Sequence, residues 1–242
     1  MAEGRRREDD GARPHPRAGD AHRINVNDSG SVDLSWGSDQ DHDDDTKGSR
    51  MSLGEGLARR VKTVSREVRV AMAAECASRV APVYVEYPVG FSYPEVQRAV
   101  EIAWQFAAGR RYDDAEIQDC LAKVTKLVDY YCDDGLDLLA ETTTVVLRAL
   151  ECVLGNDKES LRAAGRAMVS ARAAAQAAEA MANDGQQSTS PKEAAIGEEQ
   201  RWQDKAIAIA RTWQGPVSPT LFDAAGAKPP EWFVDWRQRS DR

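Results

Sequence analysis

The chain has 242 residues, of which 42% are hydrophobic and 30% are charged, and its formal net charge is −8. This composition is typical of a globular protein with a polar surface. No apolar run approaches the ~20 residues of a membrane-spanning helix, so we expect no membrane association. Proteins that bind DNA or RNA usually present a strong basic field, so the negative charge argues against a nucleic-acid partner. Nothing in the composition indicates an oligomeric state.

The first fifty residues differ from the rest of the chain. They are rich in Arg, Asp, Gly and Ser, and they end in the acidic run 39–45. Such a segment cannot bury enough apolar area to offset the entropy of ordering it. We therefore expect a disordered acidic and Arg-rich tail over residues 1–50. No apolar segment follows the arginines at positions 5–7, which argues against a signal peptide and predicts a cytoplasmic protein.

Residues 72–109 hold the densest mixture of apolar, aromatic and helix-ending residues. Ser65 predicts the start of a helix that runs toward Tyr84, with Pro82 near its end. A second helix is expected from Glu95 to Ala108, and Gly109 suits the position just past its end. The connection between these two helices is unusually aromatic.

Helical patterns continue to the C-terminus. Asp113 or Asp114 predicts the start of a helix whose apolar residues recur every three or four positions. Two further helices are expected, one stopped at Gly155 and one Ala-rich helix that runs from Asp157 to about Ala182. After a linker, a last long helix carries Trp202 and Trp213, among others. The prediction is an all-α protein, a single bundle of about six to seven helices. Its expected parts are the tail 1–50, a helical core domain 51–183, and a segment 184–242 with a linker, the final long helix and a Trp-rich end that packs on the core.

The motif Arg79-x-x-Pro82-x-Tyr84 follows Cys76 and an Ala-rich helix, and the pair Ala103-Trp104 comes later. In this, the stretch from about 68 to 180 resembles the YjaG-like bacterial domain of unknown function. Ser78 stands where that family usually has Glu, so a role of that Glu is not carried over. The chain also resembles, more loosely, the all-helical immunity proteins of bacterial polymorphic-toxin systems. Both resemblances imply a helical fold.

The folded part lacks the usual catalytic residues. All three histidines precede Met51, so a Ser–His or Cys–His pair cannot be built after it. The four cysteines form no Cys-x-x-Cys pair, and their spacing does not suggest a zinc site. We therefore predict no catalytic residue, no metal site and no cofactor. The pairs 113–114 and 133–134 are adjacent aspartates, which leaves open an enzyme that uses carboxylates or a metal.

Aromatic and charged residues lie around the connection that precedes the helix expected from Glu95 to Ala108, and two tryptophans lie near the C-terminus. Together they predict a partner-binding surface. The predicted residues are Arg79, Tyr84, Glu86, Tyr87, Phe91, Tyr93, Trp232 and Trp236. Two alternatives remain open at this point. Arg79 could form a structural ion pair with Glu75, Glu86 or a carboxylate of another helix. The two tryptophans share one helix face and could dock on the protein's own core.

These observations predict a non-enzymatic, cytoplasmic binding protein. The acidic balance and the looser resemblance suggest an immunity or antitoxin-like factor that occludes a basic toxin domain. One alternative is the carboxylate- or metal-dependent enzyme, whose reaction the sequence does not specify. Another is a scaffold protein that recruits other chains through its N-terminal tail and its C-terminal tryptophans.

Overall fold

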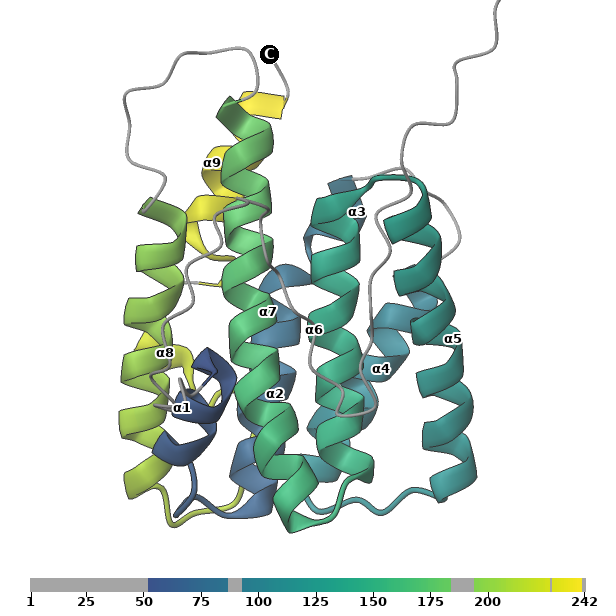
Figure 1. The fold of residues 1–242 in the computed structure, drawn as a ribbon. Helices are drawn as coiled ribbons and strands as arrows, with labels where there is room; N and C mark the ends of the chain where they lie inside the picture. Colours follow the sequence, from purple (N-terminus) through teal and green to yellow (C-terminus); the bar gives the residue numbers. More distant parts are fainter. Residues whose placement is uncertain (1–51, 87–92, 184–193, 227, 241–242) are drawn as a thin grey trace, which may run out of the picture. The chain divides into compact units, whose positions relative to one another are not determined.

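Nine α-helices and one short 3-10 helix make up the described part of the chain in the computed structural model (Figure 1). The structure describes residues 52–86, 93–183, 194–226 and 228–240. The elements are α1 (Leu53–Arg60), α2 (Arg66–Val80), α3 (Val83–Glu86), α4 (Tyr93–Ala107), α5 (Asp114–Asp133), α6 (Asp137–Leu154), α7 (Asp157–Asn183), α8 (Ala194–Thr212), η1 (Asp223–Ala225) and α9 (Glu231–Ser240). None of the described residues belongs to a β-strand, and the all-α prediction is confirmed. The predicted tail lies outside the described residues.

Local signals set several helix ends as predicted. The Oγ atom of Ser65 accepts a hydrogen bond from the backbone N–H of Val68 and caps α2. Asp113 caps α5 by accepting from the backbone N–H of Ala115 at 3.0 Å. Gly109, just after α4, has a φ of 95°, which a residue without a Cβ adopts most easily. The helix expected to run toward Tyr84 ends earlier, at Val80, and the chain restarts as the single turn α3. Pro82 lies between them and cannot donate the backbone hydrogen bond that a continuous helix needs.

The Ala-rich helix α7 lies at the centre of the packing. It contacts α1, α2, α6, α8 and α9 (Figure 1). Small side chains allow this, and seven of its alanines are fully or almost fully buried: Ala163, Ala164, Ala167, Ala171, Ala174, Ala175 and Ala178. The approach of α1 to α7 is close. A Cβ added at Gly165 would lie only 2.4 Å from the carbonyl oxygen of Gly54, so a larger residue would push α1 away.

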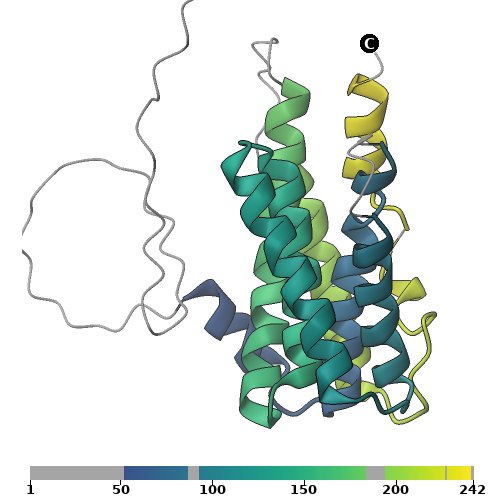
Figure 2. The same cartoon turned by 90° about the vertical axis from the view of Figure 1, so that its right-hand side faces the viewer.

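Helix α2 is covered on most sides, by α4, α6, α7 and α8. From Val68 to Val80 every residue is buried except Ser78, which is half-buried. The long helices run along a common direction (Figure 2). Helices α5 and α7 end, and α6 and α8 begin, at the end of the bundle that is uppermost in Figure 1. No helix in the described ranges has the length and apolarity needed to cross a membrane.

Candidate functional site

Arg79 is buried in the bundle and does not face a partner, which corrects the prediction from sequence. Its side chain extends from the last turn of α2, and the residue is 1% exposed. The Nε and Nη2 atoms donate to Oε2 of Glu199 on α8 at 3.3 and 3.2 Å. The guanidinium also lies 4.5 Å from the centre of the Trp202 ring. A charge removed from water needs such partners, so the structural ion pair is the alternative that the structure supports.

The ion pair belongs to a larger buried network between α2, α7 and α8. Gln203 is fully buried, and its Nε2 atom donates to the carbonyl oxygen of Met168 at 2.8 Å and to Oε1 of Glu199 at 3.4 Å. Arg172 on α7 donates to Oε1 of Gln203 at 2.8 Å. Both oxygens of Glu199 therefore have donors. Because each bond joins two different helices or two turns of α8, the network fixes α8 in one position against the core.

A second buried carboxylate ties the C-terminal segment to α2. Glu75 is 3% exposed and accepts a hydrogen bond from Nζ of Lys228 at 2.7 Å. Burial raises the pKa of the Glu75 carboxyl, and the bond with Lys228 partly offsets this. Glu75 was one of the acids that the sequence offered as a partner for Arg79. The structure pairs it with a lysine 153 positions away instead.

Tyr84 is also buried, contrary to the prediction that it contacts a partner. The residue is 5% exposed, and its hydroxyl group is hydrogen-bonded to Oγ1 of Thr143 on α6. Its ring centre lies 6.2 Å from that of Tyr131. Burial raises the pKa of the Tyr84 hydroxyl. The side chain thus joins α3 to α5 and α6, because its apolar ring fills the space between them and its hydroxyl has a partner there.

The other residues of the predicted partner-binding surface near this loop lie in different environments. Glu86 is half-buried, and its Oε1 atom lies 3.0 Å from Nε of Arg237 on α9. Tyr93, the first residue of α4, is 40% exposed. Tyr87 and Phe91 lie outside the described residues.

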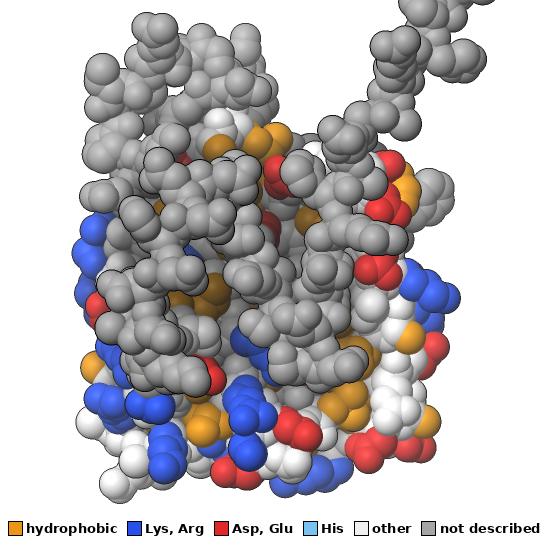
Figure 3. Space-filling model, in the orientation of Figure 1, with side chains coloured by type: hydrophobic (Ala, Val, Ile, Leu, Met, Phe, Trp, Pro, Cys, Tyr) orange, Lys and Arg blue, Asp and Glu red, His pale blue; other side chains and the backbone are white. Residues whose placement is uncertain are grey.

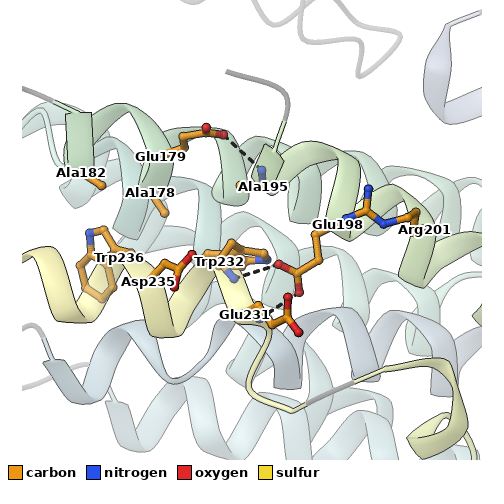
Figure 4. A pocket seen from close by; sticks show the side chains of 10 residues that line it. All are labelled: Ala178, Glu179, Ala182, Ala195, Glu198, Arg201, Glu231, Trp232, Asp235 and Trp236. Atoms are coloured by element: carbon orange, nitrogen blue, oxygen red, sulfur yellow. Dashed lines mark hydrogen bonds between the residues drawn. The ribbon is translucent and has the colours of Figure 1, made fainter. Parts of the chain in front are cut away.

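Trp232 and Trp236 point into the protein, so the prediction that they contact a partner is wrong for this structure and the docking alternative holds (Figure 4). They are 5% and 4% exposed on α9, which contacts α7 and α8. Phe233 lies between them, with ring centres 6.3 Å from Trp232 and 5.6 Å from Trp236. Covering two indoles removes a large apolar area from water, which stabilises the docked helix.

Two glutamates hold the starts of α8 and α9, and the sequence did not reveal them. Glu198 accepts hydrogen bonds from the backbone N–H groups of Glu231 and Trp232, both at 2.9 Å (Figure 4). Glu179 accepts from the backbone N–H of Ala195 at 3.2 Å. Each supplies an acceptor to unpaired N–H groups of a helix start from a neighbouring helix. A hollow of about 190 Å³ lies beside them, between α7, α8 and α9.

A cluster of carboxylates lies where α5 meets α6. We call it the acidic end, and it consists of Asp129, Asp133, Asp134, Asp137 and Glu141. No Lys or Arg occurs between Lys126 and Arg148. Within the described ranges, none of the five carboxylates forms an ion pair with Lys or Arg. Figure 3 shows carboxylate side chains beside an apolar one at this turn, at the upper right.

Burial and neighbouring carboxylates raise the pKa of two groups at this turn, Glu141 and Cys132. Burial raises the pKa of the half-buried Glu141 carboxyl to about 7, and the charge of Asp137 adds to the effect. Burial also raises the pKa of the Cys132 thiol, with further contributions from Glu141 and then from Asp129, Asp133 and Asp137. The shared influence on one thiol shows that the two helices bring these acids together. The long stretch without a basic residue was the signal in the sequence. Sequence reasoning considered its Asp133 and Asp134 as possible carboxylates of an enzyme or a metal site, and did not assign them to a binding surface.

Exposed aromatic and aliphatic groups accompany the acidic end. Tyr130 is 51% exposed, and a hydrogen bond with Asp134 raises the pKa of its hydroxyl. Val85 on α3 is 63% exposed, and α3 contacts α6. Tyrosine is enriched in protein interfaces, and the rim of an interface is polar.

Comparison with known proteins finds no matching family model, no matching curated protein and no matching solved structure. The residues that the structure describes contain no group of three or more His, Cys, Asp or Glu side chains that could hold a metal ion.

Proposed function

We propose that this protein is a non-enzymatic binding factor of the immunity or antitoxin kind, which covers a basic surface of a partner protein with the acidic end. The observation that carries the proposal is the cluster of five carboxylates without ion pairs in the described chain, next to the exposed ring of Tyr130. The net charge of −8 acts in the same direction, since it attracts a basic partner from a distance.

The electrostatics of the acidic end favour such a partner. Asp133 is the last residue of α5 and Asp134 is its C-cap, where the negative end of the helix dipole makes an anion unfavourable. Burial, with a further contribution from the charge of Asp137, raises the pKa of the Glu141 carboxyl to about 7. A Lys or Arg brought next to these groups would stabilise the charges that the free protein destabilises. The complex therefore gains an interaction that the free chain cannot make for itself.

Tyr130 supplies the apolar part of the proposed interface. Tyrosine is enriched among residues that dominate binding energies, because it buries a large ring and still offers a hydroxyl group. A partner such as a nuclease-like toxin presents basic residues at the site that binds its own acidic substrate. Covering that site with the acidic end would block it by occlusion, and no chemical step by this chain is needed.

The first test is to capture the partner with the full chain from its native cell and to measure the purified complex. We expect a basic partner whose association rate falls steeply as salt is raised, because exposed charges are screened. Asp133→Asn/Asp134→Asn should weaken the complex by about tenfold or more. The matched control is Asp114→Asn/Asp119→Asn, which removes the same charge from the first half of α5 and should change affinity by less than about twofold.

The second test concerns the biological effect. If the captured partner is toxic when produced alone, co-production of the wild-type chain should protect the cells, and the Asp133→Asn/Asp134→Asn variant should protect them less. A partner with an acidic contact surface would refute the proposal. Equal weakening by the two double variants would show that only net charge matters and that the acidic end is not the interface.

A further inference from the structure

One face of α6 changes from acidic to basic along its length. Helix α6 lies between α5 and α7 (Figure 1). Asp137, Glu141 and Arg148 follow one another at helical spacing on the same face of α6, and none of the three is buried. Glu141 and Arg148 are about 10 Å apart along the helix axis, since each residue of a helix adds about 1.5 Å. The acidic end is therefore followed by a basic region on the same face.

Two arginines of α7 enlarge this basic region. Arg162 and Arg166 are one turn apart, and neither forms an ion pair among the described residues. Burial lowers the pKa of the Arg166 guanidinium, and the charges of Arg148 and Arg162 lower it further, against the opposite effect of Glu151. The influence of both charges on one guanidinium shows that the three arginines lie near one another. We call Arg148, Arg162 and Arg166 the arginine cluster.

The nearby carboxylates do not neutralise the arginine cluster. Glu151 lies 2.6 Å from Nη1 of Arg148 and is the counter-ion of that arginine. The start of α1 is also close, because a Cβ added at Gly54 would lie 3.8 Å from Cγ of Arg166. Glu55 in this first turn accepts a hydrogen bond from the backbone N–H of Ser52 and caps α1. The half-buried Arg166 thus has no counter-ion in the described chain, and a carboxylate from another molecule would stabilise its charge.

The two charged regions complement each other but do not pair within one copy. No ion pair among the described residues joins the acidic end to the arginine cluster. A second copy turned end to end would place its acidic end over the arginine cluster of the first. A two-fold axis makes this contact twice, and two-fold dimers are the commonest protein oligomers.

We infer that a second copy of this chain covers the face formed by α6 and α7, and that the two α6 helices are antiparallel in this dimer. The arginine cluster of each copy contacts the acidic end of the other. Thr144 and Leu147, both half-buried, lie between the two charged regions and come near the two-fold axis. A parallel arrangement would place like charges together, so the charges fix the direction of the dimer.

The dimer and the proposed basic partner would compete for the acidic end. The inference goes beyond the proposed function and does not rest on it, because the dimer forms without any partner. Exposed charge pairs contribute little each, so we expect a dissociation constant on the order of 10 µM. At much lower concentrations the chain is a monomer, and its acidic end is free for the partner.

The first measurement is sedimentation equilibrium of the full chain at low salt. We expect a dimer at about 100 µM and a monomer at about 1 µM, as the expected dissociation constant requires. Raising the salt to about 0.5 M should weaken the dimer at least about tenfold, because exposed charges are screened.

Charge reversal then tests the two contacts. Arg162→Glu/Arg166→Glu reverses the arginine cluster, and Asp129→Lys/Asp133→Lys/Asp134→Lys reverses the acidic end. Each variant alone should be a monomer at about 100 µM, because both contacts would then join like charges. An equimolar mixture should form a one-to-one heterodimer with an affinity within about tenfold of the wild type, because each contact again joins opposite charges. This recovery would also show that both variants are folded.

A matched control changes the same charge elsewhere. Arg201→Glu/Lys205→Glu on α8 reverses two exposed cations that form no ion pair among the described residues. It should change the dissociation constant of the dimer by less than about threefold.

Four results would overturn the inference. The wild-type chain could remain a monomer at about 100 µM in low salt, which would leave the arginine cluster to an acidic segment of another protein. The reversed variants could dimerise like the wild type, or their mixture could remain monomeric. Assemblies larger than a dimer would refute the two-fold arrangement.

Partner binding separates this inference from the proposed function. Arg162→Glu/Arg166→Glu keeps the acidic end, so it should bind the captured basic partner at least as tightly as the wild type does. Weaker binding by this variant would overturn the competition between dimer and partner. A missing dimer with unchanged partner binding would refute only the dimer.

Discussion

The guanidinium of Arg79 donates two hydrogen bonds to a single carboxylate oxygen of Glu199, at 3.3 and 3.2 Å, where the two residues are 1% and 0% exposed. The pair joins α2 to α8, and the two residues are 120 positions apart in the chain. We expect Arg79→Met to lower the free energy of unfolding by about 3–5 kcal/mol, because Glu199 would be left as an unpaired buried charge. Urea unfolding measures the loss.

A double variant distinguishes the loss of the attraction between Arg79 and Glu199 from the cost of leaving the Glu199 carboxylate buried without its partner. Arg79→Met/Glu199→Met should recover most of the stability, since apolar residues of similar volume often replace a buried pair without loss. The control is the exposed pair of Arg60 and Asp204, where Asp204→Asn should cost less than about 1 kcal/mol. If Arg79→Met costs no more than this control, the buried network does not hold α8.

The second prediction is that Glu141 makes the protein less stable as the pH rises. Its pKa in the folded protein is raised to about 7 from an ordinary value of 4.5, so the folded state binds the proton more tightly than the unfolded state. Stability from this group is therefore full below the unfolded pKa and is lost as the pH rises through the folded one. Glu141→Gln should stabilise the protein by roughly 1–3 kcal/mol at about pH 8 and by much less at about pH 5. Urea midpoints at the two pH values give the comparison with the parent.

Binding should depend on the pH in the opposite sense. A basic partner favours the charged form of Glu141, so the complex should weaken as the pH falls below about 7. Glu141→Gln should flatten this dependence. An unchanged pH profile in that variant would place Glu141 outside the interface.

The third prediction is that the aspartates of the acidic end lower the free energy of unfolding of the protein without a partner. Asp133→Asn/Asp134→Asn removes two anions from the C-terminal end of α5, so we expect it to raise the free energy of unfolding by about 0.3–1 kcal/mol for each charge. Asp114→Asn/Asp119→Asn in the first half of the helix should lower stability slightly, because Asp114 lies in the first turn, where an anion is favourable, and Asp119 forms an ion pair with Lys123 at 2.7 Å. Thermal unfolding at low salt shows the two effects best. Destabilisation by the first variant would mean that these aspartates have a structural role.

The fourth prediction is that Trp232 holds α9 on the bundle. Trp232→Ala should lower the free energy of unfolding by about 3–5 kcal/mol, because the indole is 5% exposed and its removal leaves a large cavity. Trp213 offers a control of the same residue type. It is 39% exposed and lies just after α8, so Trp213→Ala should cost less than about 1 kcal/mol. Equal small losses would show that α9 detaches easily and that its tryptophans can reach a partner.

The sequence by itself determined the helices and most of their ends. Ser65 bonds to a backbone group three residues on, and Asp113 to one two residues on. Pro82 and Gly109 act through their own backbones. Such signals involve near neighbours in the chain, so they can be read without knowing what lies across the bundle. Much of the buried stripe of α5 was equally predictable, because Ile117, Val124 and Tyr131 recur at the helical period.

Only the tertiary structure decided which of the residues predicted to bind a partner are exposed. The sequence offered several acids as a partner for Arg79, and helix packing selected Glu199, while Glu75 received Lys228. Tyr84, Trp232 and Trp236 were expected at a surface, but neighbouring helices cover them. The acidic end required the turn that brings Glu141 on α6 beside Asp133 on α5. An aromatic or charged side chain has the same local preferences inside and outside the protein, so only the position of distant helices determines whether it is buried, paired or free to bind.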